Sequence, residues 1–293
     1  MKINKRILVT GSNGFIGSRL IDILSEMGIS VYKADLKSGV DLCDPQSFSK
    51  LPNIDILVHL AAIKSVPESF KDPWKFLMTN YSATLGALEI CRKNNARMIH
   101  ISSYIYGSPQ YIPIDEDHPL SPHNPYAQSK KASEDLCYGY QRDFGVPVTI
   151  LRPFNIYGAG LRDDSLIPSI IRQLPTGQIE MLDSEPKRDY LYIDDLCQAI
   201  IRTLTYVPHG VETFNLGSGS SKSVLDVAKM IVSLSGFDVQ IVDKHKRRKE
   251  EVMNCIADID KATNLLGWVP TWSMERGLKT ILEDWGIHDG RSW

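Results

Sequence analysis

The chain has 293 residues, of which 43% are hydrophobic, and its 33 Lys and Arg residues nearly balance its 35 Asp and Glu residues. This size suits one large α/β unit or a larger domain with a smaller partner lobe, and the balanced charge gives no reason to expect nucleic acid or an acidic membrane surface as a partner. The first residues run directly into a strand-like segment, which leaves no room for a signal peptide, and the most apolar stretch, residues 54–63, is too short to span a bilayer. We therefore expect a cytoplasmic protein without a membrane segment.

The cysteine and histidine patterns argue against a metal centre. Five cysteines are scattered without a Cys-x-x-Cys pair, and the seven histidines show no paired ligand spacing. A Gly-x-Ser-x-Gly nucleophile turn is also missing. We expect reduced thiols, no metal and no serine-hydrolase chemistry.

Strand-like apolar runs alternate with segments of helical periodicity through the first half of the chain. Strands are predicted over residues 6–10, 29–34, 55–60, 97–102 and 147–151, and helices over residues 14–27, 73–94 and 125–143. Such alternation is typical of a doubly wound parallel sheet with helices on both faces. The predicted fold class is therefore α/β.

The first strand ends in a glycine-rich turn, ILVTGSNGFIG, that carries Gly11, Gly14 and Gly17. Glycines allow a tight turn, a close approach of backbone N–H groups to a pyrophosphate, and tight packing of the next helix, although a bare glycine pattern also occurs in ordinary turns. The second strand ends at Asp35, whose carboxylate can accept both ribose hydroxyls and would repel a 2′-phosphate. This Rossmann-type pattern predicts NAD as the cofactor and favours it over NADP. The positive charge of Lys37 nearby means that NADP is not excluded.

The pattern becomes less regular after residue 155, where turn clusters appear at residues 157–160, 175–177 and 217–220. Residues 189–206 again look like a strand followed by a helix. We expect residues 1–156 to form the cofactor-binding domain and the chain to return to it at about 189–215. Residues 157–188 and 216–293 would form a smaller C-terminal substrate-binding lobe.

Tyr126 and Lys130 place a phenol and an ammonium one helical turn apart. About one such pair is expected by chance in this chain, but this one follows a strand that ends in Ser102 and Ser103. Here the sequence resembles the extended short-chain dehydrogenase/reductase family, the NAD-dependent sugar-nucleotide epimerases and dehydratases, and is nearest to UDP-glucose and UDP-N-acetylglucosamine 4-epimerases. The resemblance covers nearly the whole chain and rests on Gly11, Gly14, Gly17, residues 59–62, Asn80, Ser102, Ser103, Tyr126, Lys130, residues 152–158, residues 188–190, Asp194, Asp195, Ala257, Asp258 and residues 266–268.

The resemblance implies catalytic roles for three residues. Tyr126 takes a proton from a sugar hydroxyl, Lys130 and the positive nicotinamide stabilise the phenolate, and Ser103 holds the same hydroxyl. Lys130 also binds the nicotinamide ribose. Alignment from the strand selects Ser103, whereas alignment from Tyr106 selects Ser102; we take Ser103 because a strand fixes position better than a loop does. Two serines that only cap a turn are the alternative.

The resemblance also implies two sets of binding residues. The cofactor-binding set comprises Gly11, Asn13, Gly14, Phe15, Ile16, Gly17, Asp35, Asp41, Leu42, Leu60, Ala61, Ala62, Lys64, Asn80, Tyr126, Lys130 and Pro153. The substrate-binding set comprises Lys64, Ser103, Asn155, Arg188, Arg248 and Cys255. Plainer interpretations stay open: Lys64 as a surface lysine, residues 41–42 as a solvated turn, residues 244–249 as a solvated basic cluster, and Cys255 as a buried apolar residue. His59 is expected to be a core residue.

The function implied by the resemblance is a 4-epimerase for a UDP-hexose or UDP-N-acetylhexosamine that works through a transient 4-keto sugar. A dehydratase or a 4-ketoreductase is the alternative, although Tyr104 and Ile105 stand where 4,6-dehydratases carry an Asp-Glu pair. A non-catalytic NAD-binding scaffold or sensor is the alternative from another class. Cys255 resembles the position that gates the sugar pocket, where a small residue leaves room for an N-acetyl group. The helices at 73–94 and 125–143 correspond to the pair that joins two subunits in many relatives, which implies a homodimer.

Overall fold

The computed structural model describes residues 3–161, 165–248 and 251–288. Its centre is a six-stranded sheet in which every neighbouring pair is parallel. The strands lie in the order β2 (Tyr32–Ala34), β1 (Ile7–Thr10), β3 (Ile56–His59), β4 (Arg97–Ile101), β5 (Val148–Pro153) and β9 (Val211–Leu216). The predicted doubly wound parallel sheet is confirmed.

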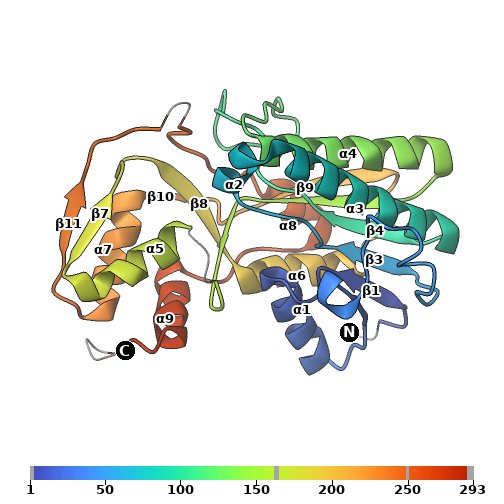
Figure 1. Cartoon of the computed structure of the whole chain (residues 1–293), viewed down its shortest axis with the longest axis horizontal. Helices are drawn as coiled ribbons and strands as arrows, with labels where there is room; N and C mark the ends of the chain where they lie inside the picture. Colours follow the sequence, from blue (N-terminus) through green and yellow to red (C-terminus); the bar gives the residue numbers. More distant parts are fainter. Residues whose placement is uncertain (1–2, 162–164, 249–250, 289–293) are drawn as a thin grey trace.

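Helices cover both faces of this sheet (Figure 1). One face carries α1 (Phe15–Glu26) and α6 (Ile193–Thr203), and the other carries α2 (Val66–Lys71), α3 (Pro73–Asn94) and α4 (Pro125–Phe144). Alternate residues of β1 divide between the two cores, because Ile7 and Val9 pack with α1 and α6 while Leu8 packs with α3. The sheet is therefore buried on both sides, as parallel sheets usually are.

The two long helices begin and end at residues suited to those positions. The Asp72 side chain accepts the Lys75 amide at the start of α3, and the Asn124 side chain accepts the Ala127 amide at the start of α4. Pro73 and Pro125 occupy the first helical positions, where no amide donor is needed. The cap at Asn124 thus places Tyr126 in the first turn of α4.

The smaller lobe lies on the left of Figure 1. It contains a three-stranded sheet of β10 (Ser221–Ser223), β8 (Lys187–Tyr192) and β6 (Asn155–Tyr157), and a two-stranded sheet of β11 (Gln240–Asp243) and β7 (Gln178–Met181). Its helices are α5 (Leu166–Gln173), α7 (Val224–Ser235) and α9 (Met274–Asp284). Because α8 (Asp260–Leu266) packs on β9 and α6, part of the C-terminal segment returns to the large sheet.

Two boundaries differ from those expected. The second strand begins at Tyr32 and not at residue 29, because the Ile29 amide donates to the Leu24 carbonyl and closes the end of α1. The strand expected at the start of the return, β8, pairs with β6 and β10, so the return begins with α6 and ends with β9.

Within the described residues, no helix has the length and apolar character needed to cross a membrane.

Candidate active site

The candidate residues gather at the carboxyl edge of the large sheet. The glycine turn follows β1, Asp35 follows β2, Ser103 follows β4, and Pro153 ends β5. The carboxyl ends of parallel strands meet at one edge, which is where ligands bind in open α/β sheets. Parallel pairing therefore assembles the site from segments far apart in the chain.

The glycine turn leaves no room for a side chain at Gly11 or Gly17. Gly11 has a φ of +65°, and its carbonyl accepts the Gly14 amide at 3.0 Å. A Cβ atom on Gly17 would lie 2.2 Å from the Gly11 carbonyl oxygen, and one on Gly11 would lie 2.7 Å from the Ala61 nitrogen. The α1 helix begins just beyond this turn without a side-chain cap, so its first amides remain available to an anion. These features fit a dinucleotide pyrophosphate.

Asp35 turns back toward the glycine turn. Its carboxylate accepts the Asn13 amide at 3.1 Å and the Lys37 amide at 3.0 Å. Burial raises the pKa of Asp35, but the hydrogen bonds from Lys37 and Asn13 and the charge of Lys37 together outweigh burial and hold the pKa below its ordinary value. Asp35 is therefore ionised at neutral pH, beside the turn.

The loop after β3 covers the other side of the turn. Leu60, Ala61 and Ala62 are half-buried there, as are Phe15 and Ile16 at the start of α1. The exposed Lys64 places its ammonium 5.4 Å from the centre of the Phe15 ring. Lys64 thus lies over the beginning of α1.

Asn80 is buried, and its amide group is occupied. Both of its N–H groups have partners, since they donate to the Ile63 carbonyl at 3.1 Å and to the Ser129 hydroxyl at 2.8 Å. Its oxygen accepts the Ile63 amide at 2.9 Å. We interpret Asn80 as a brace between the β3 loop and α4, which supports the cofactor site without offering it a free donor.

The segment with Asp41 and Leu42 divides into a turn and a core residue. The Asp41 carboxylate accepts the Cys43 amide at 2.9 Å. Leu42 is buried, and its carbonyl lies so close to α3 that a Cβ atom on Gly86 would approach it to 2.1 Å. Asp41 thus forms a local turn, whereas the burial of Leu42 does not agree with the alternative interpretation of a solvated turn.

Tyr126, Lys130 and Ser103 lie together where α4 begins. The Lys130 ammonium is buried and donates to the Ile101 carbonyl at 2.7 Å. Burial raises the pKa of Tyr126, and a hydrogen bond with the Ser103 side chain opposes that rise. Burial also lowers the pKa of Lys130 to about 8, against the opposing charge of Glu134. The neighbouring Ser102 hydroxyl is buried without a hydrogen-bond partner, so the geometry favours Ser103 as the partner of Tyr126.

His59 lies in the core. Its ring nitrogens lie 2.9 Å from the Thr10 hydroxyl and 3.2 Å from the Thr84 hydroxyl. Burial and the Lys130 charge lower the pKa of His59 to about 3, so the ring is neutral.

Three of the expected substrate residues lie near one another in the smaller lobe. The Asn155 amide donates to the Asp189 carbonyl at 3.1 Å, and the buried Cys255 thiol lies 3.9 Å from the Lys187 carbonyl. The Arg188 guanidinium forms an ion pair with Glu251 and donates to the Val252 carbonyl. These contacts bring β6, β8 and the segment before α8 into one group.

Arg248 is exposed, and no hydrogen bond or ion pair among the described residues joins it to this group. In the basic cluster, Lys244 pairs with Glu180, and Arg247 pairs with Asp183 and Glu185. Lys249 lies outside the described residues. Acidic partners, of which Glu180 and Glu185 are exposed, thus neutralise much of this cluster, as in a solvated surface.

Sequence reasoning did not anticipate two features. A cavity of about 360 Å³ lies between residues 108–112 and Glu251, Met253 and Asn254. Its only signal in the sequence is the long connection between β4 and α4. Most connections have about 4–6 residues, and much longer ones often carry a functional site. A buried network around Arg152 also lies beside the site. No cluster of His, Cys, Asp or Glu suited to a metal ion occurs in the part of the chain that the structure describes.

Comparison with known proteins identifies the family. Residues 7–217 match the model of the NAD dependent epimerase/dehydratase family. The chain belongs to this family. Its members are NAD-dependent sugar-nucleotide epimerases, dehydratases and reductases, which confirms the expected resemblance and cofactor class.

The relatives of this chain are named for different reactions. The chain is 30% identical to the GDP-6-deoxy-D-mannose reductase of Pseudomonas aeruginosa over 97% of this chain and 98% of that one. It is also 30% identical to a putative UDP-glucose 4-epimerase of Methanocaldococcus jannaschii, over 98% and 100%.

Two solved structures agree with this family assignment. RMD from Pseudomonas aeruginosa, in complex with NADPH, superposes with a TM-score of 0.89 at 29% identity and covers 96% of this chain and 99% of that one. The UDP-glucose 4-epimerase of Thermotoga maritima, with UDP-glucose, has a TM-score of 0.87 at 29% identity and covers 96% and 98%.

We predict that the protein binds NAD⁺ roughly tenfold more tightly than NADP⁺, which corresponds to about 1.4 kcal/mol. The 2′-phosphate of NADP⁺ would meet the ionised Asp35 carboxylate. Asp35→Ala should bring the two affinities together, whereas Asp22→Ala on the exposed face of α1 should leave their ratio unchanged. Calorimetric titration of each variant with both cofactors measures this, and tighter binding of NADP⁺ by the unmodified protein would contradict it.

Proposed function

We propose that the protein is an NAD-dependent nucleotide-sugar 4-epimerase that acts on a UDP-hexose or UDP-N-acetylhexosamine through a 4-keto sugar. The carrying observation is that Ser103, Tyr126 and Lys130 lie together while the two positions after Ser103 hold no acid. Such a set can move one proton off and onto a hydroxyl. It provides no acid and base at those positions for a following elimination.

The chain's own residues divide the proton chemistry between them. Ser103 holds the C4 hydroxyl of the sugar, and Tyr126 takes its proton and later returns it. The Lys130 ammonium, fixed by the Ile101 carbonyl, stabilises the phenolate form of Tyr126. NAD⁺, when bound by the glycine turn and Asp35, supplies the capacity to accept a hydride from C4 and give it back. The 4-epimer would form when C4 is reduced from the opposite face of the sugar while Tyr126 returns the proton to the C4 oxygen.

Tyr104 and Ile105 argue against a dehydratase of the 4,6 type. The Tyr104 hydroxyl donates to the Gly107 carbonyl at 2.5 Å, and burial raises the pKa of its phenol. Ile105 is fully buried. Neither residue offers a carboxylate to remove a proton or protonate a leaving hydroxyl.

A 4-ketoreductase is the second candidate, because the chain covers nearly all of a GDP-6-deoxy-D-mannose reductase at 30% identity. A reductase consumes its reduced cofactor, whereas an epimerase regenerates the cofactor in each cycle. The RMD structure was solved with NADPH, and an ionised Asp35 opposes a 2′-phosphate. Asp35 therefore supports the epimerase.

The test is incubation with a panel of UDP-, dTDP-, GDP- and CDP-sugars, with products resolved by NMR. A 4-epimer formed without net change of cofactor supports the proposal. Stoichiometric oxidation of NADPH by a 4-keto sugar would assign a reductase, and a 4-keto-6-deoxy product would assign a dehydratase. Cofactor binding without any turnover would favour a scaffold or sensor.

The outer face of α3 supports a homodimer. Four large apolar residues at helical spacing are exposed there: Trp74 at 74%, Met78 at 43%, Tyr81 at 40% and Leu85 at 36%. Tyr138 on the adjoining α4 is 46% exposed. An exposed apolar stripe along a helix is typical of a surface that a second subunit covers.

Tyr126→Phe should lower turnover by about 10²–10⁴-fold, because only the proton-transfer group is lost. NAD⁺ affinity and the unfolding midpoint should change little, whereas Lys130→Ala should weaken both turnover and NAD⁺ binding. Tyr138→Phe, which removes a phenol hydroxyl that contacts Thr213 of β9 and not Ser103, is the matched control. Initial rates and calorimetry separate these effects, and near-normal turnover by Tyr126→Phe would show that the assigned mechanism is wrong.

Cys255→Tyr should selectively remove activity toward UDP-N-acetylhexosamines. The added bulk would fill space that the N-acetyl group needs, while a plain hexose would still fit. Cys255→Ser keeps the size and serves as the control. The measurement is kcat/KM for both substrates; an equal loss on both would assign Cys255 to the core, where it packs with Tyr106 and Phe154.

The unmodified protein should be a dimer at micromolar concentration by light scattering. Leu85→Asp, alone or with Tyr81→Asp, should produce monomers, because a charge would be buried in the apolar stripe. Val207→Asp, at a residue that is 67% exposed elsewhere on the molecule, should remain dimeric. A monomeric unmodified protein would reject the proposed dimer.

A further inference from the structure

A buried ion pair joins the helix that carries Tyr126 to the central sheet. Arg152 of β5 donates from Nε to Glu134 Oε1 at 3.0 Å and from Nη2 to Glu134 Oε2 at 2.7 Å. The two side chains are only 4% and 1% exposed. Glu134 lies one helical turn beyond Lys130 on the inner face of α4. A bidentate pair of this kind fixes both groups in position.

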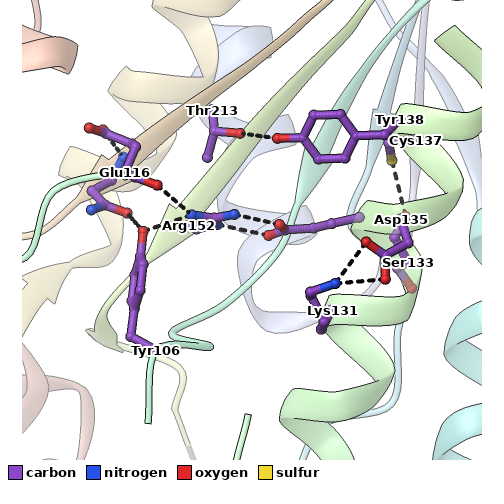
Figure 2. A network of polar contacts seen from close by, with 11 residues as sticks. Tyr106, Glu116, Lys131, Ser133, Asp135, Cys137, Tyr138, Arg152 and Thr213 are labelled. Carbon is purple, nitrogen blue, oxygen red and sulfur yellow. Dashed lines mark hydrogen bonds and ion pairs between the residues drawn. The ribbon is translucent and has the colours of Figure 1, made fainter. Parts of the chain in front are cut away.

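The network extends from Arg152 to the loop that carries Ser103 (Figure 2). Arg152 Nη1 donates to the Tyr106 hydroxyl at 2.9 Å, and that hydroxyl donates to Asn215 Oδ1 at 2.6 Å. The backbone N–H of Asn215 donates to Glu116 Oε1 at 2.6 Å. One set of bonds therefore spans α4, the loop after β4, and strands β5 and β9.

Glu134 is also the acidic group that faces Lys130. From β3 and β4, Lys130 faces His59 and His100, which burial keeps neutral by lowering the pKa of each ring. From α4 it faces Cys137, whose pKa burial raises, so the thiol is also neutral. The Glu134 charge opposes the effect of burial on the pKa of Lys130. Among the described residues around Lys130, Glu134 supplies the negative charge.

We propose that Glu134 is a positioning residue for the reaction. Held by Arg152, it keeps the Lys130 ammonium charged, and through Tyr106 the same network keeps the Ser103 loop in register with Tyr126. A stability role alone explains the pair poorly, because buried ion pairs can often be replaced by apolar groups without loss of stability. The kinetic part of this proposal rests on the proposed function, whereas its electrostatic part does not.

The kinetic test compares Glu134→Gln with Glu116→Gln. Both variants neutralise a carboxylate of the same network, fully buried at Glu134 and half-buried at Glu116, but only Glu134 faces Lys130. In Glu134→Gln, the alkaline limb of the kcat profile should move to lower pH by about one unit, a tenfold change in the ionisation constant. KM should change much less than kcat. In Glu116→Gln the alkaline limb should stay where it is.

A second test needs no substrate. Urea unfolding of the unmodified protein, Glu134→Gln, Lys130→Met and the double variant forms a double-mutant cycle. Coupling between the two positions should be present at pH 7, where Lys130 is charged, and should disappear at pH 10, above its pKa of about 8. If Glu134→Gln does not fold, the cycle is run with Glu134→Gln/Arg152→Gln in its place, which leaves no unpaired guanidinium.

The proposal is overturned if coupling is absent at pH 7, or if the alkaline limb of folded Glu134→Gln coincides with that of the unmodified protein. It is also overturned if Glu116→Gln shifts the limb equally, since the effect would then belong to the network as a whole. Failure of every nucleotide sugar to react would contradict the proposed function and leave the unfolding cycle to decide the role of Glu134.

Discussion

The buried ammonium of Lys130 is the constraint on which the candidate site depends. A charge removed from water costs several kcal/mol unless neighbouring groups compensate for it. Here the Ile101 carbonyl at the end of β4 accepts it at 2.7 Å. That bond fixes the height of α4 above the sheet, and Tyr126, one turn earlier, therefore lies where the chain emerges from β4 and reaches Ser103. The position of a single buried charge thus brings the three groups together.

The inner face of α4, which carries Lys130, is polar at other positions as well. Ser129, Ser133 and Glu134 are all buried there, in an interface that would ordinarily be apolar. The Ser129 hydroxyl receives a bond from Asn80 and Ser133 one from Thr84, so α3 satisfies the polar atoms that α4 presents. Burial of polar groups is tolerated when each has a partner. Hydrogen bonds as well as apolar packing therefore join α3 to α4.

Sequence patterns predicted those parts of the fold that are determined by residues within the same segment. Helices expected at 73–94 and 125–143 are observed as Pro73–Asn94 and Pro125–Phe144, because caps and periodicity lie within the segments themselves. Roles that depend on a distant partner were not predictable in this way. The position of Asn80 in the sequence does not reveal that its side-chain amide bonds to Ile63 and Ser129. The position of Arg188 likewise does not reveal its ion pair with Glu251. Periodicity indicates which face of an element is buried, but it does not identify the group that the face will contact.

The smaller lobe is held in register with the large sheet by another buried carboxylate. Asp189 of β8 accepts the amides of Ser218 at 2.6 Å and Gly219 at 3.1 Å, just beyond β9, and the amide of Ala257 at 3.0 Å. A Cβ atom on Gly217 would lie 2.5 Å from this carboxylate, so the close approach requires glycine there. Arg188 adjoins Asp189 along β8, and Cys255 lies two residues before Ala257. The groups assigned to the substrate are thereby positioned against the end of the cofactor sheet by backbone bonds, while the Arg188 side chain pairs with Glu251 and the Asn155 side chain bonds to the Asp189 carbonyl.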